Sequence, residues 1–455
     1  MITRRTTELA RLLLIGVTAL SCAKPVKDRI ALVGVTIIDG TDAPAREDQV
    51  VILKGSKIDT IAPTAGFEIP KSAMVIDLKG KWLMPGLIDA DGEVRRWAVT
   101  RYLAFGVTAV RDIGNDQDSI LALAEEASLH SLVSPRLYVS GAALDGIPPF
   151  DPSSTPLANE AAARRAVDDR AQAGTSFIST GPGMAIGLLR GAADEAANLN
   201  TSVSARLGLT DARTAARSGV KAQVELSGVP QAAINPEPFY AAFRKSPWAG
   251  WTAVERSWAG LDSTALTAVA RDLASAGATL VPALSMHDTW SRLDDPAVTG
   301  GEDLAYVPES AKDAWDLTGF ETRAGWDAST YPQFRAGRIK QDLFVREFRL
   351  AGGRVAAGTG ASRPMLVPGA SLHREMELLV GAGLPPDDVI RAATSNAAAL
   401  IGADSIGTVA PGKVADLLVL DADPRADIRN TRKISRVILG GVILDADSLA
   451  RRARQ

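Results

Sequence analysis

Two acidic residues, Asp91 and Glu93, flank Gly92 just after an apolar run and are the clearest pair of chemical groups in the sequence. Residues two apart on a β-strand point to the same side, so both carboxylates would face one site. Carboxylate oxygens are ligands that Ca²⁺ and Mg²⁺ prefer. Two carboxyl groups whose pKa values are pushed apart can also act as an acid/base pair. A simpler interpretation is that both are solvated and pair with Arg95 or Arg96.

Side chains that bind transition metals are scarce in this chain. It has three histidines, His130, His287 and His373, and one cysteine, Cys22. One cysteine excludes an intrachain disulfide and a thiolate zinc cluster, and three scattered histidines are few for a histidine-rich site. His287 follows a predicted strand and His373 lies in a predicted helix, so we keep both as binding candidates. His130 ends a polar helix, where we expect it to be solvated.

Composition sets broad limits on function. The 455 residues are 46% hydrophobic, which allows a large core and more than one compact unit. Acidic and basic residues nearly balance, with a formal net charge of −3. Because no basic stripe is visible, we expect no nucleic-acid partner.

The amino terminus has the pattern of an export signal. Arg4 and Arg5 precede an apolar run over residues 12–20, which ends at Ser21 and Cys22. This pattern is typical of a secretory signal, and the run is shorter than the roughly 20 residues that span a bilayer. Residues 19–22 (ALSC) resemble a bacterial lipobox, although alanine replaces the usual leucine. We therefore expect residues 1–22 to be a signal peptide and Cys22 to be lipidated.

The signal peptide and lipidation at Cys22 would make the protein an exported lipoprotein, periplasmic or anchored to the outer membrane. Acyl chains can tether a folded domain to a membrane without a transmembrane helix, so the lipid anchor would be the only membrane contact. Simple secretion with an incidental cysteine remains the alternative.

The middle of the chain alternates apolar strands with amphipathic helices. This alternation implies a parallel sheet, and eight units suggest a closed (β/α)₈ barrel. The predicted strands cover residues 82–88, 107–111, 136–140, 176–179, 202–205, 222–226, 279–284 and 354–358. The predicted helices cover residues 161–173, 209–218, 263–276, 372–380 and 387–394.

Both ends of the chain have the pattern of β-structure, with predicted strands near residues 31–38, 50–53, 58–61 and 74–78 and again at 415–420, 434–439 and 442–444. We therefore predict an α/β protein with a TIM-like (β/α)₈ barrel and a small β-sandwich domain composed of both chain ends. The predicted boundaries are 29–80 plus 405–449 for the composite domain and 81–404 for the barrel.

Residues 285–344 form a long aromatic stretch that we expect to be irregular. The stretch follows predicted strand seven, on the face where barrels place their binding loops. Five tryptophans in this region and before it either pack this insertion or line a pocket for an apolar or peptide-like ligand. They are Trp248, Trp251, Trp258, Trp290 and Trp315.

Six stretches resemble the amidohydrolase superfamily, in its imidazolonepropionase-like and prolidase-like branch, and the likeness runs from about residue 30 to 447. The resemblance implies the barrel with a two-ended β domain. It also implies hydrolysis of C–N bonds in amides, peptides and cyclic ureas, usually with one or two zinc ions. The stretches are 79–90 (KGKWLMPGLIDA), 106–112 (GVTAVRD), 135–141 (PRLYVSG), 368–380 (PGASLHREMELLV), 391–394 (RAAT) and 406–417 (IGTVAPGKVADL).

The positions at which the family holds its metal are changed in this chain. The family's first strand ends Asp-x-His-x-His, and here Asp91 and Glu93 replace both histidines. Ser179 stands where the fourth strand supplies a lysine that is carbamylated, and Ser204 where the fifth supplies a histidine. Leu226 follows Glu225 where the sixth strand ends Glu-His-Gly. Gly360 stands where the eighth ends Gly-Thr-Asp.

Ser179 and Ser204 could be imagined as nucleophiles, but no motif places a histidine or lysine to activate them. We therefore assign no confident catalytic residue and no metal ligand. We also expect no bound cofactor, because the family's zinc ligands are missing.

Two functions remain open. One is a non-catalytic homologue that binds a small-molecule or peptide-like ligand, with an intact amidohydrolase paralogue as a candidate partner. The other is an active hydrolase of carbon–nitrogen bonds with an atypical carboxylate-based metal site built from Asp91, Glu93 and Glu225.

Overall fold

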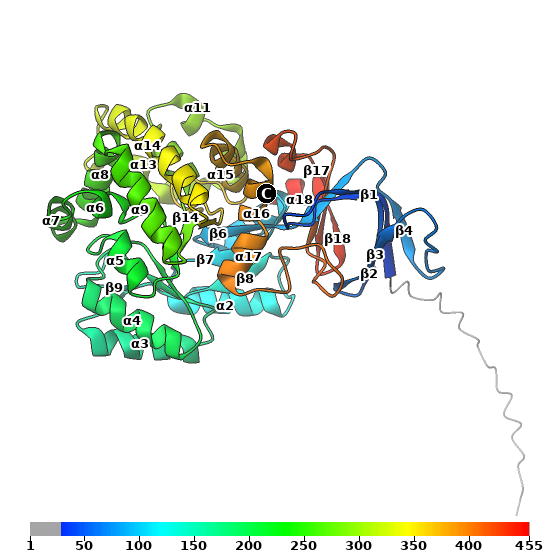
Figure 1. Cartoon of the computed structure of the whole chain (residues 1–455), viewed down its shortest axis with the longest axis horizontal. Coiled ribbons are helices and arrows are strands. Elements are labelled where there is room, and N and C mark those ends of the chain that lie inside the picture. Colours follow the sequence, from blue (N-terminus) through cyan, green and yellow to red (C-terminus); the bar gives the residue numbers. More distant parts are fainter. Residues whose placement is uncertain (1–28, 455) are drawn as a thin grey trace, which may run out of the picture.

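Parallel strands form a barrel in the computed structural model, which describes residues 29–454 (Figure 1). Strands β6, β7 and β8 pair in one parallel sheet, and β11 to β15 pair in another. Ser176 N donates to Val139 O beside β8, and Ala90 N of β6 donates to Ala357 O after β15. These bonds close the ring of eight strands that the sequence predicts. The strands are β6 (Leu87–Gly92), β7 (Val107–Asp112), β8 (Arg136–Val139), β11 (Ile178–Thr180), β12 (Val203–Ala205), β13 (Ala222–Val224), β14 (Thr279–Val281) and β15 (Arg354–Val355), with β9 (Leu144–Asp145) and β10 (Thr155–Pro156) beside β11.

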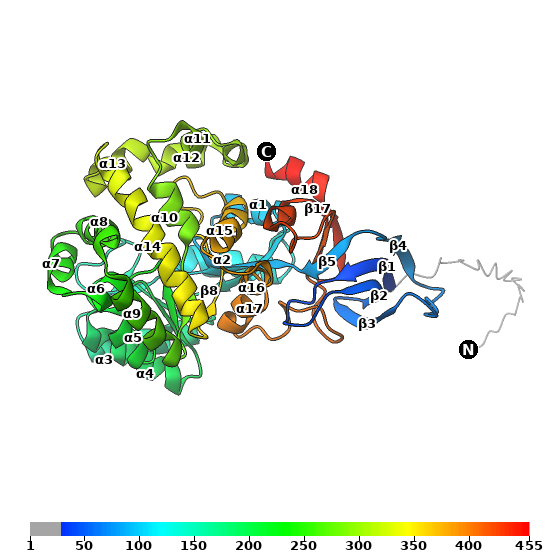
Figure 2. The ribbon, with the colours of Figure 1, turned by 45° about the horizontal axis from the view of Figure 1, so that its top comes forward.

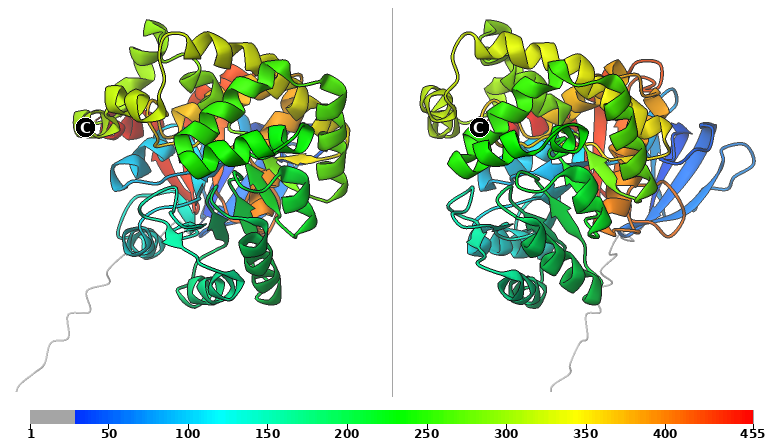
Figure 3. Two further views of the ribbon diagram at one scale, coloured as in Figure 1. Left: turned by 90° about the vertical axis from the view of Figure 1, so that its left-hand side faces the viewer. Right: turned by 60° about the vertical axis from the view of Figure 1, so that its left-hand side comes forward.

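Helices form the outer wall of the barrel (Figures 2 and 3), with α3 packed against α4 and α9 against α14. The predicted helices correspond to α3, α5, α9, α15 and α16. The helical elements outside the insertion are η1 (Arg96–Ala98), α1 (Val99–Ala104), α2 (Gln117–Ser128), α3 (Glu160–Gln172), α4 (Ile186–Asn198), α5 (Ala212–Arg217), α6 (Val229–Ala233), α7 (Glu237–Lys245), α8 (Pro247–Ser257), η2 (Trp258–Gly260), α9 (Ser263–Ser275), α15 (Ala370–Gly381), α16 (Pro386–Ala392), α17 (Ser395–Ile401), η4 (Ile428–Arg432) and α18 (Ala446–Ala453).

A mixed sheet built from both chain ends lies beside the barrel and projects from it in the right-hand view of Figure 3. Its strand order is β18-β17-β16-β5-β1-β2-β3, with β4 paired to β1. Apolar side chains from the N-terminal and C-terminal strands pack in one cluster, as predicted for a two-ended β domain. The strands are β1 (Arg29–Ile37), β2 (Arg46–Lys54), β3 (Lys57–Pro63), β4 (Met74–Asp77), β5 (Trp82–Pro85), β16 (Leu417–Leu420), β17 (Ile434–Leu439) and β18 (Val442–Asp445).

The strand predicted over residues 82–88 is divided between the two units. β5 pairs with β1 and β16 in the mixed sheet, whereas β6 begins the barrel. Gly86 lies at the crossing, and a Cβ atom there would come within 2.1 Å of Thr108 Oγ1. Only glycine fits this close approach, so the change of sheet has a local steric cause.

The prediction that residues 285–344 are irregular is wrong, because most of the insertion is helical. α14 alone has 21 residues and buries Phe334, Phe344 and Phe348 on one face. These aromatics are spaced among charged residues at intervals that return to one side of a helix. The elements are α10 (Leu284–Trp290), α11 (Pro296–Thr299), η3 (Glu302–Tyr306), α12 (Glu309–Trp315), α13 (Leu317–Ala324) and α14 (Thr330–Leu350).

Within residues 29–454, no helix combines the length and the apolar character needed to cross a membrane. The predicted signal peptide and Cys22 lie outside the described residues.

Candidate active site

Asp91 and Glu93 lie at the end of β6, at the mouth of the barrel. Asp91 is fully buried, so the interpretation that it is solvated is wrong. Glu93 is 15% exposed, and Arg95 Nη2 lies 3.9 Å from its Oε2, but its short contact is with another arginine. Arg96 pairs instead with Glu126.

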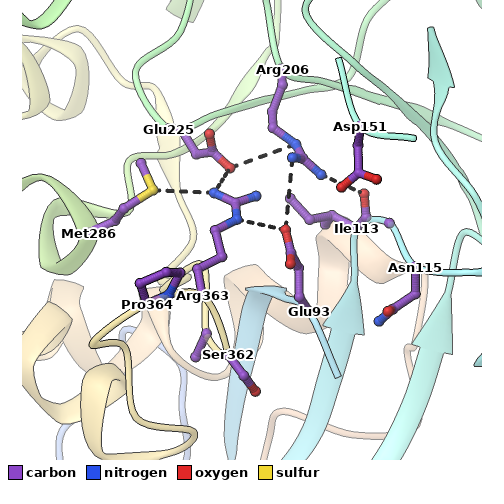
Figure 4. Close-up of polar contacts among 12 residues, drawn as sticks. Glu93, Ile113, Asn115, Asp151, Arg206, Glu225, Met286, Ser362, Arg363 and Pro364 are labelled. Carbon is purple, nitrogen blue, oxygen red and sulfur yellow. Dashed lines mark hydrogen bonds and ion pairs between the residues drawn. The ribbon is translucent and has the colours of Figure 1, made fainter. Parts of the chain in front are cut away.

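Arg363 bridges two of the acidic residues at the mouth (Figure 4). Its Nε donates to Glu93 Oε1 at 2.6 Å, and its Nη1 donates to Glu225 Oε1 at 2.7 Å. The three side chains are only 7–15% exposed. Arg363 follows β15 while Glu93 and Glu225 follow β6 and β13, so one guanidinium joins three strand ends.

Arg206, immediately after β12, places a second guanidinium beside the same carboxylates (Figure 4). Its Nη1 lies 3.9 Å from Glu93 Oε1, and its Nε lies 3.7 Å from Glu225 Oε1. Its Nη2 donates to the Ile113 carbonyl at 3.2 Å. Glu93 and Glu225 therefore each lie near two arginines.

Burial and neighbouring charges drive the pKa values of the acids apart. Burial raises the pKa of Asp91 well above its ordinary value, and the nearby Glu225 carboxylate raises it further. Burial also acts to raise the pKa of Glu225, but Arg363 and Arg206 outweigh it and lower that pKa below its ordinary value. Asp91 is thus the weaker acid of the two, and Glu225 is the one that the arginines favour in its charged form.

Arg111, at the end of β7, lies fully buried near Asp91. Its Nη1 donates to Ser204 Oγ at 3.1 Å, and its guanidinium stacks 3.6 Å above the Phe177 ring. Burial lowers the pKa of Arg111 to about 9, against the opposing effect of Asp91. Arg111 therefore supports the barrel interior, where it joins β7 to Ser204 and Phe177.

The four remaining family positions hold no free nucleophile. Ser179 Oγ donates to the Ile113 carbonyl at 2.5 Å, and Ser204 Oγ accepts from Arg111. Leu226 is 1% exposed, and Gly360 adopts φ +73°. Neither serine contacts a histidine or lysine, so the arrangement gives no activated hydroxyl.

The binding candidates among the histidines are buried under the mouth or away from it. His287 Nε2 lies 3.1 Å from the Glu225 carbonyl, and its Nδ1 lies 2.9 Å from Glu255 Oε1. His287 therefore holds the backbone of Glu225, which has φ +60°.

His373 lies between the barrel and η4, where its ring nitrogens contact Thr431 Oγ1 and the Phe105 carbonyl. Burial lowers the pKa of His373 to about 3, so it is a neutral structural residue. His130 is exposed just after α2, as expected.

Two tryptophans of the insertion hold the loop that carries Arg363. Trp315 Nε1 donates to the Ser362 carbonyl and Trp290 Nε1 to the Pro364 carbonyl, both at 3.0 Å. Trp290 packs with Trp248 and Trp251 in an aromatic cluster, and Trp258 lies in the main core. These contacts support the packing interpretation of the tryptophans.

The donor set at the mouth does not fit the zinc ions of the family. Zinc sites use histidine, cysteine or carboxylate ligands that face one point. Among residues 29–454, no three histidine, cysteine, aspartate or glutamate side chains are grouped in that way. The Glu93 and Glu225 oxygens that could bind a cation instead accept hydrogen bonds from Arg363.

A small polar cavity opens beside Arg206. It is lined by Glu93, Asp145, Phe150 and Asp151, among other residues, and its volume is about 10 Å³. That is room for about one water molecule, so a ligand as large as a dipeptide would have to bind outside this cavity.

Sequence reasoning missed the two arginines that dominate the site. Arg206 directly follows the strand predicted over residues 202–205, and Arg363 lies three residues beyond Gly360. Side chains just past the C-terminal ends of barrel strands face the mouth. That position was the available signal for both residues.

Comparison with known proteins agrees with this architecture. Residues 350–444 match the amidohydrolase family, while no curated protein matches the chain by sequence. A candidate prolidase from Bifidobacterium longum has a similar structure, with 22% identity and a TM-score of 0.68 over 95% of this chain and 100% of that one. A Xaa-Pro dipeptidase with bound methionine is 16% identical, with a TM-score of 0.66 over 92% of this chain and 100% of that one. Bottromycin amidohydrolase is 20% identical, with a TM-score of 0.74 over 93% of this chain and 89% of that one. Residues 350–444 therefore match the amidohydrolase family, and the chain as a whole shares the fold of these structures.

Proposed function

We propose that this protein is a non-catalytic member of the amidohydrolase superfamily that binds a small-molecule or peptide-like ligand. The observation that carries the proposal is the pairing of Arg363 with Glu93 and Glu225 at 2.6 and 2.7 Å. These acids stand at strand ends that supply metal ligands or neighbouring residues in the family. Here they accept hydrogen bonds from guanidinium groups.

The remaining chemistry at the mouth supports the same conclusion. A metal in this family would polarise the scissile carbonyl and activate a water molecule, with a carboxylate moving the proton. In this chain, Gly360 replaces the family's proton-shuttling aspartate and Ser179 replaces its bridging lysine. Neither position offers a side chain that could take over those roles, because Gly360 has none and Ser179 already donates to a carbonyl.

The ligand class is suggested by related structures. A candidate prolidase and a Xaa-Pro dipeptidase share this fold, and both names refer to peptide-like substrates. We therefore propose a peptide-like ligand before other small molecules. We also propose that the protein uses no bound cofactor and acts beside an intact amidohydrolase paralogue.

Metal analysis combined with a substrate panel tests the proposal. The full chain is purified and assayed for bound metals. It is then incubated with dipeptides and cyclic amides in the presence of Zn²⁺, Mn²⁺, Mg²⁺ or Ca²⁺, with a metal-loaded Xaa-Pro dipeptidase as the positive control. We expect no stoichiometric metal and no turnover. One or two tightly held zinc ions per chain, or metal-dependent turnover, would overturn the proposal.

An active hydrolase with a carboxylate-based metal site is the second candidate, and one observation favours it. Both carboxyl oxygens of Asp91 are buried and find no hydrogen-bond partner within residues 29–454, which leaves them free for a ligand or a proton. A metal at this site would have to draw Glu93 and Glu225 away from Arg363. Metal-dependent turnover that is abolished in D91N would establish this candidate.

We further propose export and lipid anchoring at Cys22, on the strength of the basic, apolar and small-residue pattern of residues 1–22. Labelled palmitate should enter the wild-type chain and not C22S. Equal labelling of both, or of neither, would reject the anchor.

A further inference from the structure

Three acidic side chains, Asp91, Glu93 and Glu225, come together at the barrel mouth, and an enclosed group of this kind needs a compensating positive charge. Asp91 is fully buried. The charge of Glu225 raises its pKa, whereas the charges of Arg363 and Arg206 lower it. Carboxylates that share a buried site repel one another strongly. Removing the opposite charge from a buried pair is strongly destabilising.

We infer that Arg363 is a built-in cation that does the structural work of the metal ion, joining strand ends of the barrel through the carboxylates at its mouth. This inference rests on the proposed function, since it assumes that no metal occupies the mouth. It goes further by assigning the joining of the strand ends to one residue, Arg363. Arg363 contacts Glu93 after β6 and Glu225 after β13 from its own place after β15.

The shape of the guanidinium suits this role. Its Nε and Nη1 donate to two different carboxylates at the same time, as a planar fork of donors can. A lysine ammonium is a compact point charge on a flexible stem, so it would not reproduce this fixed fork. Arg206 adds charge from 3.7–3.9 Å but makes no comparable short contact with either acid.

The surroundings of Arg363 fix it in place. Trp315 and Trp290 donate hydrogen bonds to the carbonyls of the residues immediately before and after it. Ser362 N donates to the Glu93 carbonyl at 3.2 Å, and Met286 Sδ accepts from Arg363 Nη1 at 3.3 Å. Trp315 and Trp290 of the insertion thus hold the Arg363 guanidinium in the mouth.

One consequence can be measured directly. Without Arg363, Glu93 and Glu225 would keep only arginines that lie 3.7–3.9 Å away, Arg206 and Arg95. Oxygen ligands of this kind favour Ca²⁺ and Mn²⁺. The variant R363M should therefore acquire an affinity for divalent cations that the wild-type protein lacks.

The experiment compares thermal unfolding of the full chain with and without CaCl₂ or MnCl₂ for wild type, R363M and R338M. Arg338 is a matched control because its side chain is 12% exposed, against 11% for Arg363, and it pairs with Asp342 rather than with an acid of the mouth. Both variants should unfold at a lower temperature than wild type. Only R363M should show a saturable rise in its midpoint with added cation, because binding to the folded state stabilises it.

The inference is overturned if wild type shows the same saturable rise, or if folded R363M shows none. If R363M does not fold, R363K is measured instead. A midpoint below that of wild type in R363K supports the inference, because a lysine ammonium keeps the charge but not the fork of donors, whereas a midpoint equal to wild type rejects it. None of these readouts involves hydrolysis, so failure here leaves the proposed lack of catalysis standing. Zinc in the wild-type protein would overturn the proposed function itself.

Discussion

Glu375 gives a prediction about stability that can be worked out from its surroundings. This glutamate of α15 is fully buried, and its Oε2 accepts from Ser285 N at 2.6 Å. Its Oε1 finds no partner within the described residues. Burial raises the pKa of Glu375 from 4.5 to about 7, although the hydrogen bonds from Ser285 and Leu284 oppose the rise.

The direction of the pH effect follows from this raised pKa. Below about pH 4 the group is protonated in both the folded and the unfolded chain. Between pH 4.5 and 7 the unfolded chain releases its proton first, so the free energy of unfolding falls as the pH rises. One pKa unit corresponds to about 1.4 kcal/mol, so the full loss is roughly 3 kcal/mol and is complete above pH 7.

The substitution E375Q removes this loss, because an amide does not ionise and its carbonyl oxygen can still accept from Ser285 N. We expect E375Q to match wild type closely at pH 5 and to exceed it at pH 8 by up to roughly 3 kcal/mol. Buried Asp89 and Asp112, with pKa values of about 7 and about 6, act in the same direction. Some dependence on pH should therefore remain in the variant.

Urea unfolding followed by tryptophan fluorescence at pH 5, 6, 7 and 8 measures the effect. E377Q is the matched control, since Glu377 lies on the same helix, is 24% exposed and pairs with Arg374. Its difference from wild type should not grow with pH. The reasoning is refuted if E375Q differs from wild type by the same amount at every pH, or is the less stable protein at pH 8.

Three further substitutions test other contacts. R136A should cost about 3–5 kcal/mol of unfolding free energy, because it leaves the buried Asp416 carboxylate without the guanidinium at 2.5 Å and with only the hydrogen bond from Gly440 N. K81A at the exposed pair with Asp421 should cost less than about 1 kcal/mol, and equal losses in chemical denaturation would contradict this. H373A should destabilise by about 1–3 kcal/mol at pH 8 through the lost bond to the Phe105 carbonyl. Because burial lowers the pKa of His373 from 6.5 to about 3, only the unfolded chain takes up this proton as the pH falls from 6.5 towards 3, so the loss should shrink by roughly 2 kcal/mol between pH 8 and pH 5; a loss that is the same at both pH values would refute this reasoning. W315F should lower stability by about 1–2 kcal/mol by removing the donor to the Ser362 carbonyl, and a thermal midpoint equal to wild type would remove this residue from the loop's support.

The order of the barrel strands and the two-ended sheet could be predicted because each depends on local pattern. Short apolar runs alternating with helices imply a parallel sheet wherever they occur. The split at Gly86 could not be predicted in this way, since the sequence reads as one apolar run and the division depends on Thr108 from another strand. The insertion was misjudged because α14 mixes its buried aromatics with many charges.

The sequence pointed to the strand ends that carry the candidate site but not to the arginines that occupy it. The positions of Asp91, Ser179 and Gly360 follow from motifs at strand ends. Arg363 lies outside those motifs and reaches the mouth only because its loop bends back under the two tryptophans. Such a placement depends on tertiary contacts between residues far apart in sequence, which neither spacing nor periodicity records.

The position of β16 in the mixed sheet affects how the protein can be made. β16 pairs with β5 on one side and with β17 on the other, so the edge of β5 stays open until the ribosome has produced almost the whole chain. An unpaired strand edge is a template for association with other chains, and pairing across so long a loop is slow. The β5 edge of the nascent protein is therefore unpaired throughout translation of the barrel. A chain that ends before residue 417 should aggregate, because it never makes the strand that covers this edge.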